Sequence, residues 1–425
     1  MNDTTVGIGD IGVYIPHGNI SLENLLAHRQ GENPDILPRL ERAVQSTGQQ
    51  AIRFPLAFQD NSVLATHAAR KLIEQTPDFK PSLLRYLAAG TETSVDHSKP
   101  LAAYVQGMLQ RSGVDLPNSL SSFQVQHACA GGTVSLLSIA AMLFAGGAEN
   151  ETGIVLCSDI ARYQGSTTAE ITQGAGAVAL LVERDPGLVA LDLKTTGYSS
   201  HDVDDFFRPL GSIFAKVKGQ YSVQCYQQAF DEALQNHAER SGCTPGEALE
   251  KTDIFALHVP FRNMALNALR QALKKHLGLD IAQADAFLQA RGFLASLEPA
   301  AETGNIYSGS VYLALANSLR ERRQQLGDQL PGKSCMIISY GSGNTMLMIR
   351  GTVSQRALSI IDRWDLDAIL HSPLDEDIKG YLQWMDLPQD PERLNLLLSE
   401  TSVPPGSYAL NSIREDGYRE YKYHQ

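Results

Sequence analysis

Cysteine is scarce in this sequence, and its spacing excludes two classes of protein. The five cysteines are scattered and odd in number, and the chain has neither a C-x-x-C pair nor histidine pairs at metal-ligand spacing. A disulfide framework or a zinc site would need such pairs. We therefore expect free thiols, a cytoplasmic location and no metal site.

Long apolar runs and excess basic charge are also lacking. The most apolar stretch, 134–148, is shorter than the ~20 residues that span a bilayer, and it ends in two adjacent glycines. No basic region followed by an apolar run marks a secretion signal. The formal net charge of −12 argues against nucleic acid or an anionic membrane as a partner. We expect 134–148 to be a core helix.

The remaining pattern is typical of a layered α/β enzyme. Apolar strands without alternation follow helices throughout the 425 residues, which favours sheets buried on both faces. Strand–helix–strand alternation occurs in both 1–187 and 188–350, so we expect two related halves, although no sequence repeat at a fixed period is visible. The more polar segment 351–425 is expected to be peripheral.

Cys129 lies at a predicted strand-to-helix turn, between a strand ending at Val125 and a helix from Val134. Backbone N–H groups and the helix dipole favour negative charge at such a turn, which lowers a thiol pKa and yields a nucleophilic thiolate. The alternative is a buried structural cysteine, followed by glycines that allow close helix packing. The local sequence alone leaves both interpretations open.

Other reactive side chains follow predicted strands, namely Glu92, His258 and Asn305. A glycine-rich turn, 339–344, joins two further strands and contains Gly341 and Ser342. Taken one at a time, each has an explanation without function. Glu92 can be a surface carboxylate, His258 a loop histidine and Asn305 a turn residue, and the glycine-rich turn can be a simple hairpin. The turn is not a phosphate loop, because no Gly-Lys-Ser/Thr follows it.

Taken together, these residues suit acyl transfer. The Cys129 thiolate can accept an acyl group, and Glu92 can move a proton on and off carbon. His258 and Asn305 can hydrogen-bond a thioester carbonyl. The backbone N–H groups of Cys129 and Ser342 can form an oxyanion hole.

Several motifs along nearly the whole chain resemble those of one family, the hydroxymethylglutaryl-CoA synthases of the thiolase superfamily. They are, in order, GTETSVD at 90–96, AC at 128–129, SDIARY at 158–163, TQGAGAVA at 172–179, DFFRP at 205–209, HVPF at 258–261, GNIY at 304–307, SYGSG at 339–343 and REY at 419–421. The resemblance implies a five-layered αβαβα thiolase fold with its site between the halves, and a homodimer.

The resemblance also implies roles for single residues. Cys129 forms an acetyl-enzyme from acetyl-CoA, which is a substrate and not a resident cofactor. Glu92 then removes a proton from the acetyl methyl group, and the carbanion attacks the β-ketone of an acetoacetyl thioester held by His258 and Asn305. Hydrolysis at Cys129 frees the product. Further substrate-binding candidates are Tyr163, Arg208, Tyr307, Gly341 and Ser342, with pairing to Asp204 or Asp205 as the alternative for Arg208.

Some features depart from the family pattern. Asn263 stands where many relatives have a lysine that is thought to hold coenzyme A, and Ala130 replaces an aromatic residue after the cysteine. The stretch 285–303 looks more like the branch that adds β-methyl groups to polyketides. Acyl carrier proteins, which are acidic, then bring the thioester, and a basic entrance is expected from Arg262, Arg270, Lys274 and Lys275.

We therefore expect a hydroxymethylglutaryl synthase reaction in polyketide β-branching, or otherwise in the mevalonate pathway, with a CoA or carrier-protein thioester as partner. Two alternatives stay open. One is a ketoacyl synthase III-like enzyme that uses Cys129, His258 and Asn305. The other is a non-catalytic acyl-binding protein of thiolase fold.

Overall fold

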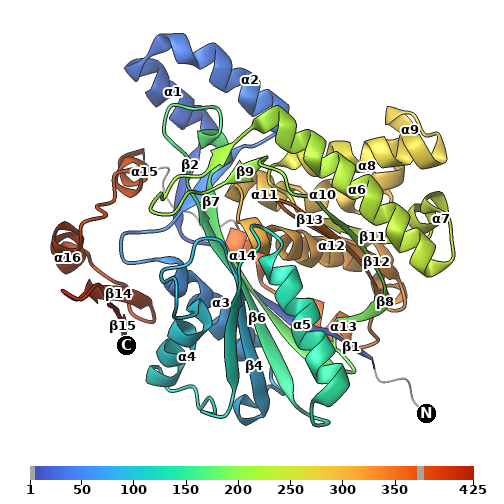
Figure 1. Ribbon diagram of the computed structural model, residues 1–425, viewed down its shortest axis with the longest axis horizontal. Helices are drawn as coiled ribbons and strands as arrows, with labels where there is room; N and C mark the ends of the chain where they lie inside the picture. The colour runs from blue at the N-terminus through green and yellow to red at the C-terminus, as the bar shows by residue number, and fades with distance from the viewer. Residues whose placement is uncertain (1–4, 371–377) are drawn as a thin grey trace.

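A nine-stranded sheet runs through the centre of the computed structural model, which describes residues 5–370 and 378–425 (Figure 1). The strand order is β11-β12-β13-β8-β1-β7-β6-β4-β5. In chain order the strands are β1 (Val6–Tyr14), β4 (Leu84–Gly90), β5 (Ser121–Val125), β6 (Thr152–Ala161), β7 (Gly174–Arg184), β8 (Val189–Ser200), β11 (Ile254–Leu257), β12 (Ser334–Gly341) and β13 (Thr345–Val353).

The sheet consists of two parts that meet at a short junction. β1 and β8 pair at Gly7 with Ala190 and at Ile8 with Val189. On one side of this junction, β4 pairs in parallel with β5 and β6, whereas β7 pairs antiparallel with β6 and β1. On the other side, β11 and β12 are parallel and β13 is antiparallel to β12 and β8. Each part comes from one of the two predicted halves.

The helices cover both sheet parts and also separate them. Their bounds are α1 (Leu22–Glu32), α2 (Leu37–Thr47), α3 (Asn61–Gln75), α4 (Leu101–Arg111), α5 (Gly131–Gly146), α6 (Gly219–Ser241), α7 (Pro245–Glu250), α8 (Arg262–Leu277), α9 (Ile281–Gln289), α10 (Phe293–Ser296), α11 (Glu298–Thr303), α12 (Ser310–Leu326), α13 (Ala357–Ile361), α14 (Leu366–Leu370), α15 (Ile378–Met385) and α16 (Pro391–Glu400).

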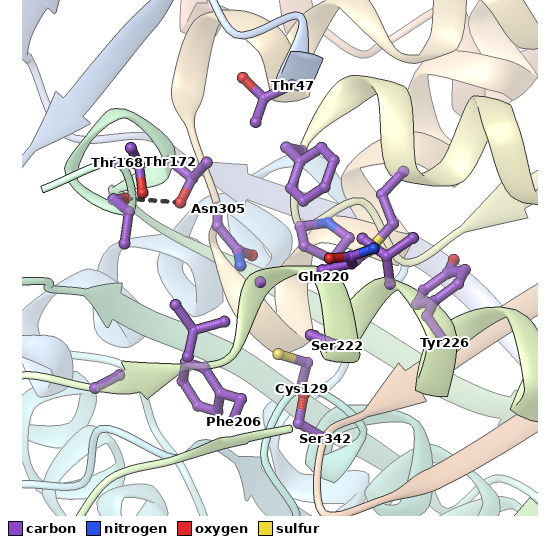
Figure 2. A pocket seen from close by; sticks show the side chains of 18 of the residues that line it. Thr47, Cys129, Thr168, Thr172, Phe206, Gln220, Ser222, Tyr226, Asn305 and Ser342 are labelled. Carbon is purple, nitrogen blue, oxygen red and sulfur yellow. Dashed lines mark hydrogen bonds between the residues drawn. The ribbon is translucent and has the colours of Figure 1, made fainter. Parts of the chain in front are cut away.

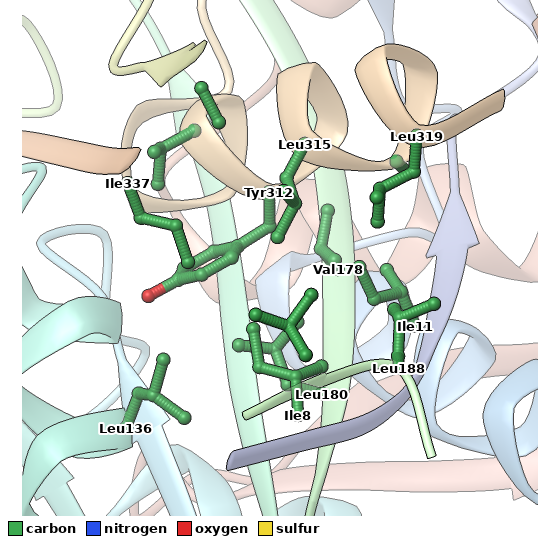
Figure 3. Close-up of a cluster of buried hydrophobic side chains, with 14 of the residues drawn as sticks. Ile8, Ile11, Leu136, Val178, Leu180, Leu188, Tyr312, Leu315, Leu319 and Ile337 are labelled. Atoms are coloured by element: carbon green, nitrogen blue, oxygen red, sulfur yellow. The ribbon is translucent and has the colours of Figure 1, made fainter. Parts of the chain in front are cut away.

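The middle layer is formed by α5 and α12. Leu136 of α5 shares one buried cluster with Tyr312, Leu315 and Leu319 of α12, and Ile8 lies in the same cluster (Figure 3). α3 and α4 pack on the outer face of the first sheet part, and α6 and α8 pack on that of the second. This arrangement confirms the predicted αβαβα layers.

Helix α5 is apolar around most of its circumference, and its most extensive packing is against β4, β6 and β7 of the first sheet part. By length and composition alone, the stretch Ala128–Gly146 would also pass as a membrane span, with a mean hydropathy of 1.8. Its packing against three strands instead identifies it as the middle layer of the fold, as the sequence predicts.

Short strands and the C-terminal segment complete the molecule. The remaining strands are β2 (Gly18–Ser21), β3 (Ala51–Phe54), β9 (Phe206–Phe207), β10 (Lys216–Val217), β14 (Tyr408–Ile413) and β15 (Arg419–Tyr423). β14 and β15 form a hairpin against α3 and α4, where Tyr408 and Tyr421 are buried. The division into 1–187, 188–350 and 351–425 stays a prediction.

Candidate active site

One cavity of about 710 Å³ reaches Cys129 from the surface between α2, α6 and α8. Cys129 and Ser342 lie at one end of the view in Figure 2, and Thr47 of α2 lies at the opposite end. Of the predicted site residues, Cys129, Tyr163, His258, Asn305, Tyr307 and Ser342 line it. Residues distant in sequence therefore meet in a single site, and both sheet parts contribute to it.

The turn that carries Cys129 is tightly constrained. Ala128 has φ of 38°, a left-handed conformation that is uncommon for a residue with a side chain. The Ala130 N–H donates to the His127 carbonyl at 2.9 Å. A Cβ atom on Gly341 would lie 2.7 Å from the Ala130 Cβ, so only glycine lets the end of β12 approach this turn. Gly341 thus provides close packing beside Cys129, and its predicted part in substrate binding stays a prediction.

Burial dominates the electrostatics of the thiol. It raises the pKa of Cys129 well above its usual value, and the carboxylates of Glu92 and Asp159 raise it further. The expectation of a lowered thiol pKa is wrong for the free protein, because desolvation and two nearby carboxylates outweigh the favourable helix terminus. The resting cysteine is a thiol.

His258 follows β11 and is held from two sides. Its backbone N–H donates to the Ile338 carbonyl at 2.8 Å, and its Nδ1 lies 2.6 Å from Oγ of Ser310. Burial lowers the pKa of His258 to about 3, so the imidazole is neutral near pH 7.

Asn305 lies beside His258 in the lining of the cavity. Its Oδ1 accepts the Tyr307 N–H at 2.8 Å, and its own N–H donates to the Thr172 carbonyl at 3.1 Å. The side-chain amide is therefore fixed through its oxygen, and its NH₂ group remains as the donor for an acyl oxygen.

Glu92 lies after the end of β4 in a dense hydrogen-bond network. Its backbone N–H and that of Thr93 donate to Oδ1 of Asp159 at 3.0 and 3.2 Å, and the Thr91 and Thr93 hydroxyls donate to the same oxygen at 2.7 Å each. Burial raises the pKa of Glu92 to about 8, with Asp159 adding to the rise and Arg208 opposing it. Desolvation is therefore the main reason that this carboxyl group holds its proton more tightly than an exposed one.

Arg208 contacts Glu92 rather than the cavity. Its Nη2 lies 3.1 Å from Oε1 of Glu92 and 3.2 Å from the Tyr307 hydroxyl. The alternative ion pair of Arg208 with Asp204 or Asp205 is not formed: Asp204 pairs with Lys218, and Asp205 accepts from Tyr340 and Gly343.

Three aromatic rings surround the sulfur of Cys129. Phe206 lies edge-on to Tyr163 and to Tyr307, with ring centroids 6.4 and 5.8 Å apart. Ala215 belongs to the same buried cluster as Cys129, Tyr163 and Tyr307. This box of rings and small side chains can exclude water from an acyl group on the cysteine.

Sequence reasoning missed several residues of the site. Ser310 contacts His258, Phe206 closes the aromatic box, and Asp159 fixes the Glu92 loop. Asp159 and Phe206 lie inside the motifs SDIARY and DFFRP, so the sequence carried a signal for both. In the described parts of the chain, no three His, Cys, Asp or Glu side chains gather as a metal-ligand set.

The expected basic entrance is largely neutralised. Ion pairs join Arg262 to Glu298 at 2.9 Å, Arg270 to Asp285 at 2.7 Å and Lys275 to Asp231 at 3.0 Å. Of the four predicted cations, only Lys274 lacks a carboxylate partner among the described residues. The prediction of a basic patch on α8 is wrong, because acidic neighbours on α6, α9 and α11 compensate three of its charges.

The αβαβα layers, with a cysteine next to the middle helix α5 and a histidine and an asparagine from the second half, define a condensing enzyme of the thiolase superfamily. Two family profiles match the chain: "Hydroxymethylglutaryl-coenzyme A synthase N terminal" over residues 3–186 and "Hydroxymethylglutaryl-coenzyme A synthase C terminal" over 272–424. The chain belongs to the hydroxymethylglutaryl-CoA synthase family.

Named relatives and solved structures match this chain over nearly its full length. The hydroxymethylglutaryl-CoA synthase of Haloferax volcanii is 26% identical and covers 99% of both chains. A solved structure, MvaS in complex with 3-hydroxy-3-methylglutaryl coenzyme A, is 34% identical over 100% of both chains, with a TM-score of 0.84. The curacin pathway HMG synthase with its holo donor-ACP shares the fold, at 22% identity, with a TM-score of 0.82 over 99% of this chain and 100% of that one.

Proposed function

We propose that this protein condenses an acetyl group on Cys129 with the β-ketone of an acetoacetyl thioester and then releases the hydroxymethylglutaryl product. The observation that carries this proposal is the single cavity that brings Cys129, His258 and Asn305 together beside Glu92. The thioester substrates supply all the carbon, and we propose that no resident cofactor takes part.

The first step forms the acetyl-enzyme. The sulfur of Cys129 attacks the carbonyl of the acetyl thioester and loses its proton, while the carrier departs as a free thiol. Because burial raises the pKa of the resting thiol, we assign deprotonation to the bound state, in which a substrate carbonyl accepts backbone N–H donors.

The second step forms the carbon–carbon bond. The Glu92 carboxylate takes a proton from the acetyl methyl group, the resulting carbanion attacks the ketone carbon, and protonated Glu92 returns a proton to the new alkoxide. Neutral His258 and the Asn305 amide hold the thioester carbonyl of the acceptor. Water then cleaves the Cys129 thioester and restores the thiol.

Intact-protein mass spectrometry tests this sequence of steps. We expect acetyl-CoA to add one acetyl group at Cys129, and acetoacetyl thioester to convert this species into free enzyme and a hydroxymethylglutaryl product. Acetylation that leads to another condensation product would favour the ketoacyl synthase III-like alternative. Failure of any acetyl donor to modify Cys129 would favour the acyl-binding alternative.

For the acceptor, we propose an acyl carrier protein, as in polyketide β-branching. Lys216 is the one lysine or arginine among the described residues that line the cavity. Asn263, where many relatives have a lysine, donates to the Ser46 carbonyl at 3.1 Å, and neighbouring Arg262 pairs with Glu298. The cavity and the start of α8 therefore offer little charge to the diphosphate and 3′-phosphate of coenzyme A. The arm of a carrier protein has a single phosphodiester and needs less positive charge at this opening, so the proposal rests on the arm and not on a basic docking face.

The CoA thioester is the second candidate acceptor, because a 34% identical neighbour was solved with 3-hydroxy-3-methylglutaryl coenzyme A. It would place the reaction in the mevalonate pathway. Parallel reactions of the acetylated enzyme with acetoacetyl-CoA and acetoacetyl-carrier protein separate the two. A kcat/KM for the carrier protein that exceeds that for CoA supports our proposal, and the reverse order rejects it.

We further propose that the protein is a cytoplasmic homodimer. All five cysteines are free thiols, as a reducing compartment favours. β5 is the edge strand of the large sheet, and an open edge is a ready pairing surface for a second copy. Sedimentation equilibrium that gives the mass of one chain at micromolar concentration would reject the dimer.

A further inference from the structure

We infer that Arg208 is a positioning residue that orients Glu92 for proton abstraction and supplies its counter-charge; this inference rests on the proposed function. Nη1 of Arg208 donates to the backbone carbonyl of Glu92 at 2.7 Å, and Nη2 donates to Oε1 of the same residue at 3.1 Å. One guanidinium therefore fixes both the main chain and the side chain of the proposed base. A lysine ammonium lacks this fork geometry.

The charges around Glu92 require a cation. The side chains of Glu92 and Arg208 are 8% and 13% exposed, and the wholly buried Asp159 lies against the same loop. Asp159 is satisfied by hydroxyl and backbone donors from Thr91, Thr93 and Ser308. Within the described structure, Arg208 is the single cation in contact with Glu92. Without it, two carboxylates would share a desolvated site.

Arg208 reaches this site through the two-stranded hairpin β9–β10. The hairpin is anchored at Asp205, whose Oδ1 accepts the Gly343 N–H at 2.9 Å and whose Oδ2 accepts the Tyr340 hydroxyl at 2.8 Å. Phe206 on the same hairpin contacts the rings of Tyr163 and Tyr307 in the cavity. The hairpin thus places Phe206 among the aromatic rings near Cys129 and Arg208 against the Glu92 carboxylate.

The second contact of Arg208 orients another site residue. Nη2 also donates to the Tyr307 hydroxyl oxygen at 3.2 Å, and the guanidinium carbon lies 5.7 Å from the centre of that ring. The Tyr307 oxygen accepts from Arg208, and the Tyr307 hydroxyl in turn hydrogen-bonds the Tyr163 side chain, so Arg208 sets the direction of a donor at the edge of the acyl box. Loss of Arg208 would disturb both the base and this donor.

The expected defect is confined to proton removal. Acetylation of Cys129 does not use Glu92 as a base, whereas formation of the acetyl carbanion does. Acetyl-enzyme in D₂O should exchange methyl hydrogens for deuterium only when Glu92 is ionised. Exchange followed by mass spectrometry therefore reports on Glu92 without any acceptor.

We would compare Arg208→Gln and Arg208→Lys with the wild type. In Arg208→Gln, we expect acetylation to persist, and the midpoint of the exchange-versus-pH curve to rise by more than about one pH unit. Exchange at neutral pH should fall at least ~10-fold. Arg208→Lys keeps the charge, so its midpoint should stay nearer the wild-type value, with a lower maximal rate. An unchanged midpoint in both variants would overturn the inference.

Two controls keep the test decisive. Arg320→Gln breaks an exposed ion pair with Asp367 on the far helices α12 and α14 and should change neither acetylation nor exchange.

If the wild type acetylates and exchanges but forms no hydroxymethylglutaryl product, the proposed function fails while the role of Arg208 is still measured. If no acetyl-enzyme forms at all, infrared titration of the Glu92 carboxyl group measures the effect of Arg208→Gln on its pKa, with Glu92→Gln as the blank. An equal titration midpoint with and without Arg208 would again overturn the inference.

Discussion

Nδ1 of His258 lies 2.6 Å from Oγ of Ser310. The same oxygen accepts the backbone N–H of Val259 at 3.1 Å. We assign the Ser310 hydroxyl as the donor to Nδ1, because this role leaves on Nε2 the proton that a carbonyl-binding imidazole needs. The proton of the neutral ring then resides on Nε2. A histidine held in this tautomer donates a hydrogen bond and does not act as a base, which suits the binding of a thioester carbonyl.

We predict that Ser310→Ala weakens condensation more than acetylation. Removal of the hydroxyl frees the ring to adopt the other tautomer and costs the two buried hydrogen bonds to His258 and Val259, of about 1 kcal/mol each. The kcat/KM for the acceptor should fall about 10-fold, as measured by product formation from pre-acetylated enzyme.

Ser318→Ala is a matched control for this variant. Ser318 lies on the same helix, is also buried, and donates to the Phe255 carbonyl at 3.2 Å. It should lose similar stability with little change in kinetics. Equal loss of acceptor kcat/KM in both variants would contradict the tautomer argument.

The Cys129 and Glu92 variants should separate the two chemical steps. Cys129→Ala removes the atom that accepts the acetyl group, so no acetyl-enzyme should be detected by mass. Glu92→Ala keeps the thiol and loses the proposed base, which typically lowers such a rate 10²–10⁴-fold, roughly. It should therefore acetylate and then stall. Normal condensation by Glu92→Ala would exclude it as the base.

Condensation should rise with pH through the ionisation of Glu92. The base must be ionised to take a proton, and burial places its pKa at about 8. The pre-steady-state condensation rate of acetylated enzyme should therefore increase from pH 6, reach half its maximum near pH 8 and level off about one unit higher. A flat profile over this range would mean that another step or another base limits the reaction.

The raised pKa of Glu92 also predicts that the free energy of unfolding falls as the pH rises, whereas the condensation rate increases. The folded pKa of Glu92 lies far above the ordinary value of 4.5, so the folded state holds a proton that the unfolded state has lost between about pH 4.5 and 8. Wild-type stability should fall across this window relative to Glu92→Gln, and the difference should stay constant above it. Thermal unfolding at pH 5, 7 and 9 measures this trend.

Local sequence determines much of the fold. Apolar residues at helical spacing over 61–75 predict a helix, and α3 has these bounds in the structure, because Asp60 caps it by accepting from the N–H groups of Ser62 and Val63. Apolar strands and glycine-bounded helices were equally recognisable. In the polar segment after Val353, only the family resemblance at 419–421 was noted, and the helices α13–α16 were not anticipated.

The site was predictable where function selects a reactive residue type, and not where distant segments meet. The sequence indicates Cys129, His258 and Asn305 directly, because they are reactive or hydrogen-bonding side chains that follow predicted strands. The raised thiol pKa and the paired entrance cations depend on burial and on partners far away in sequence, such as Asp231 with Lys275. Strand and helix patterns contain no information on these contacts.

The start of α8, where Phe261 and Met264 line the cavity, offers a direct test of carrier choice through Asn263→Lys. Asn263 donates to backbone carbonyls at the end of α2, where a cation is favourable for the helix dipole, so the fold should tolerate lysine. An added charge near the CoA phosphates contributes about 1 kcal/mol, and the KM for acetoacetyl-CoA should fall about 5-fold. Gln106→Lys on α4, which packs on the outer face of the first sheet part and contributes no residue to the cavity, controls for net charge. If both variants lower this KM equally, the identity of residue 263 does not set the preference for the carrier.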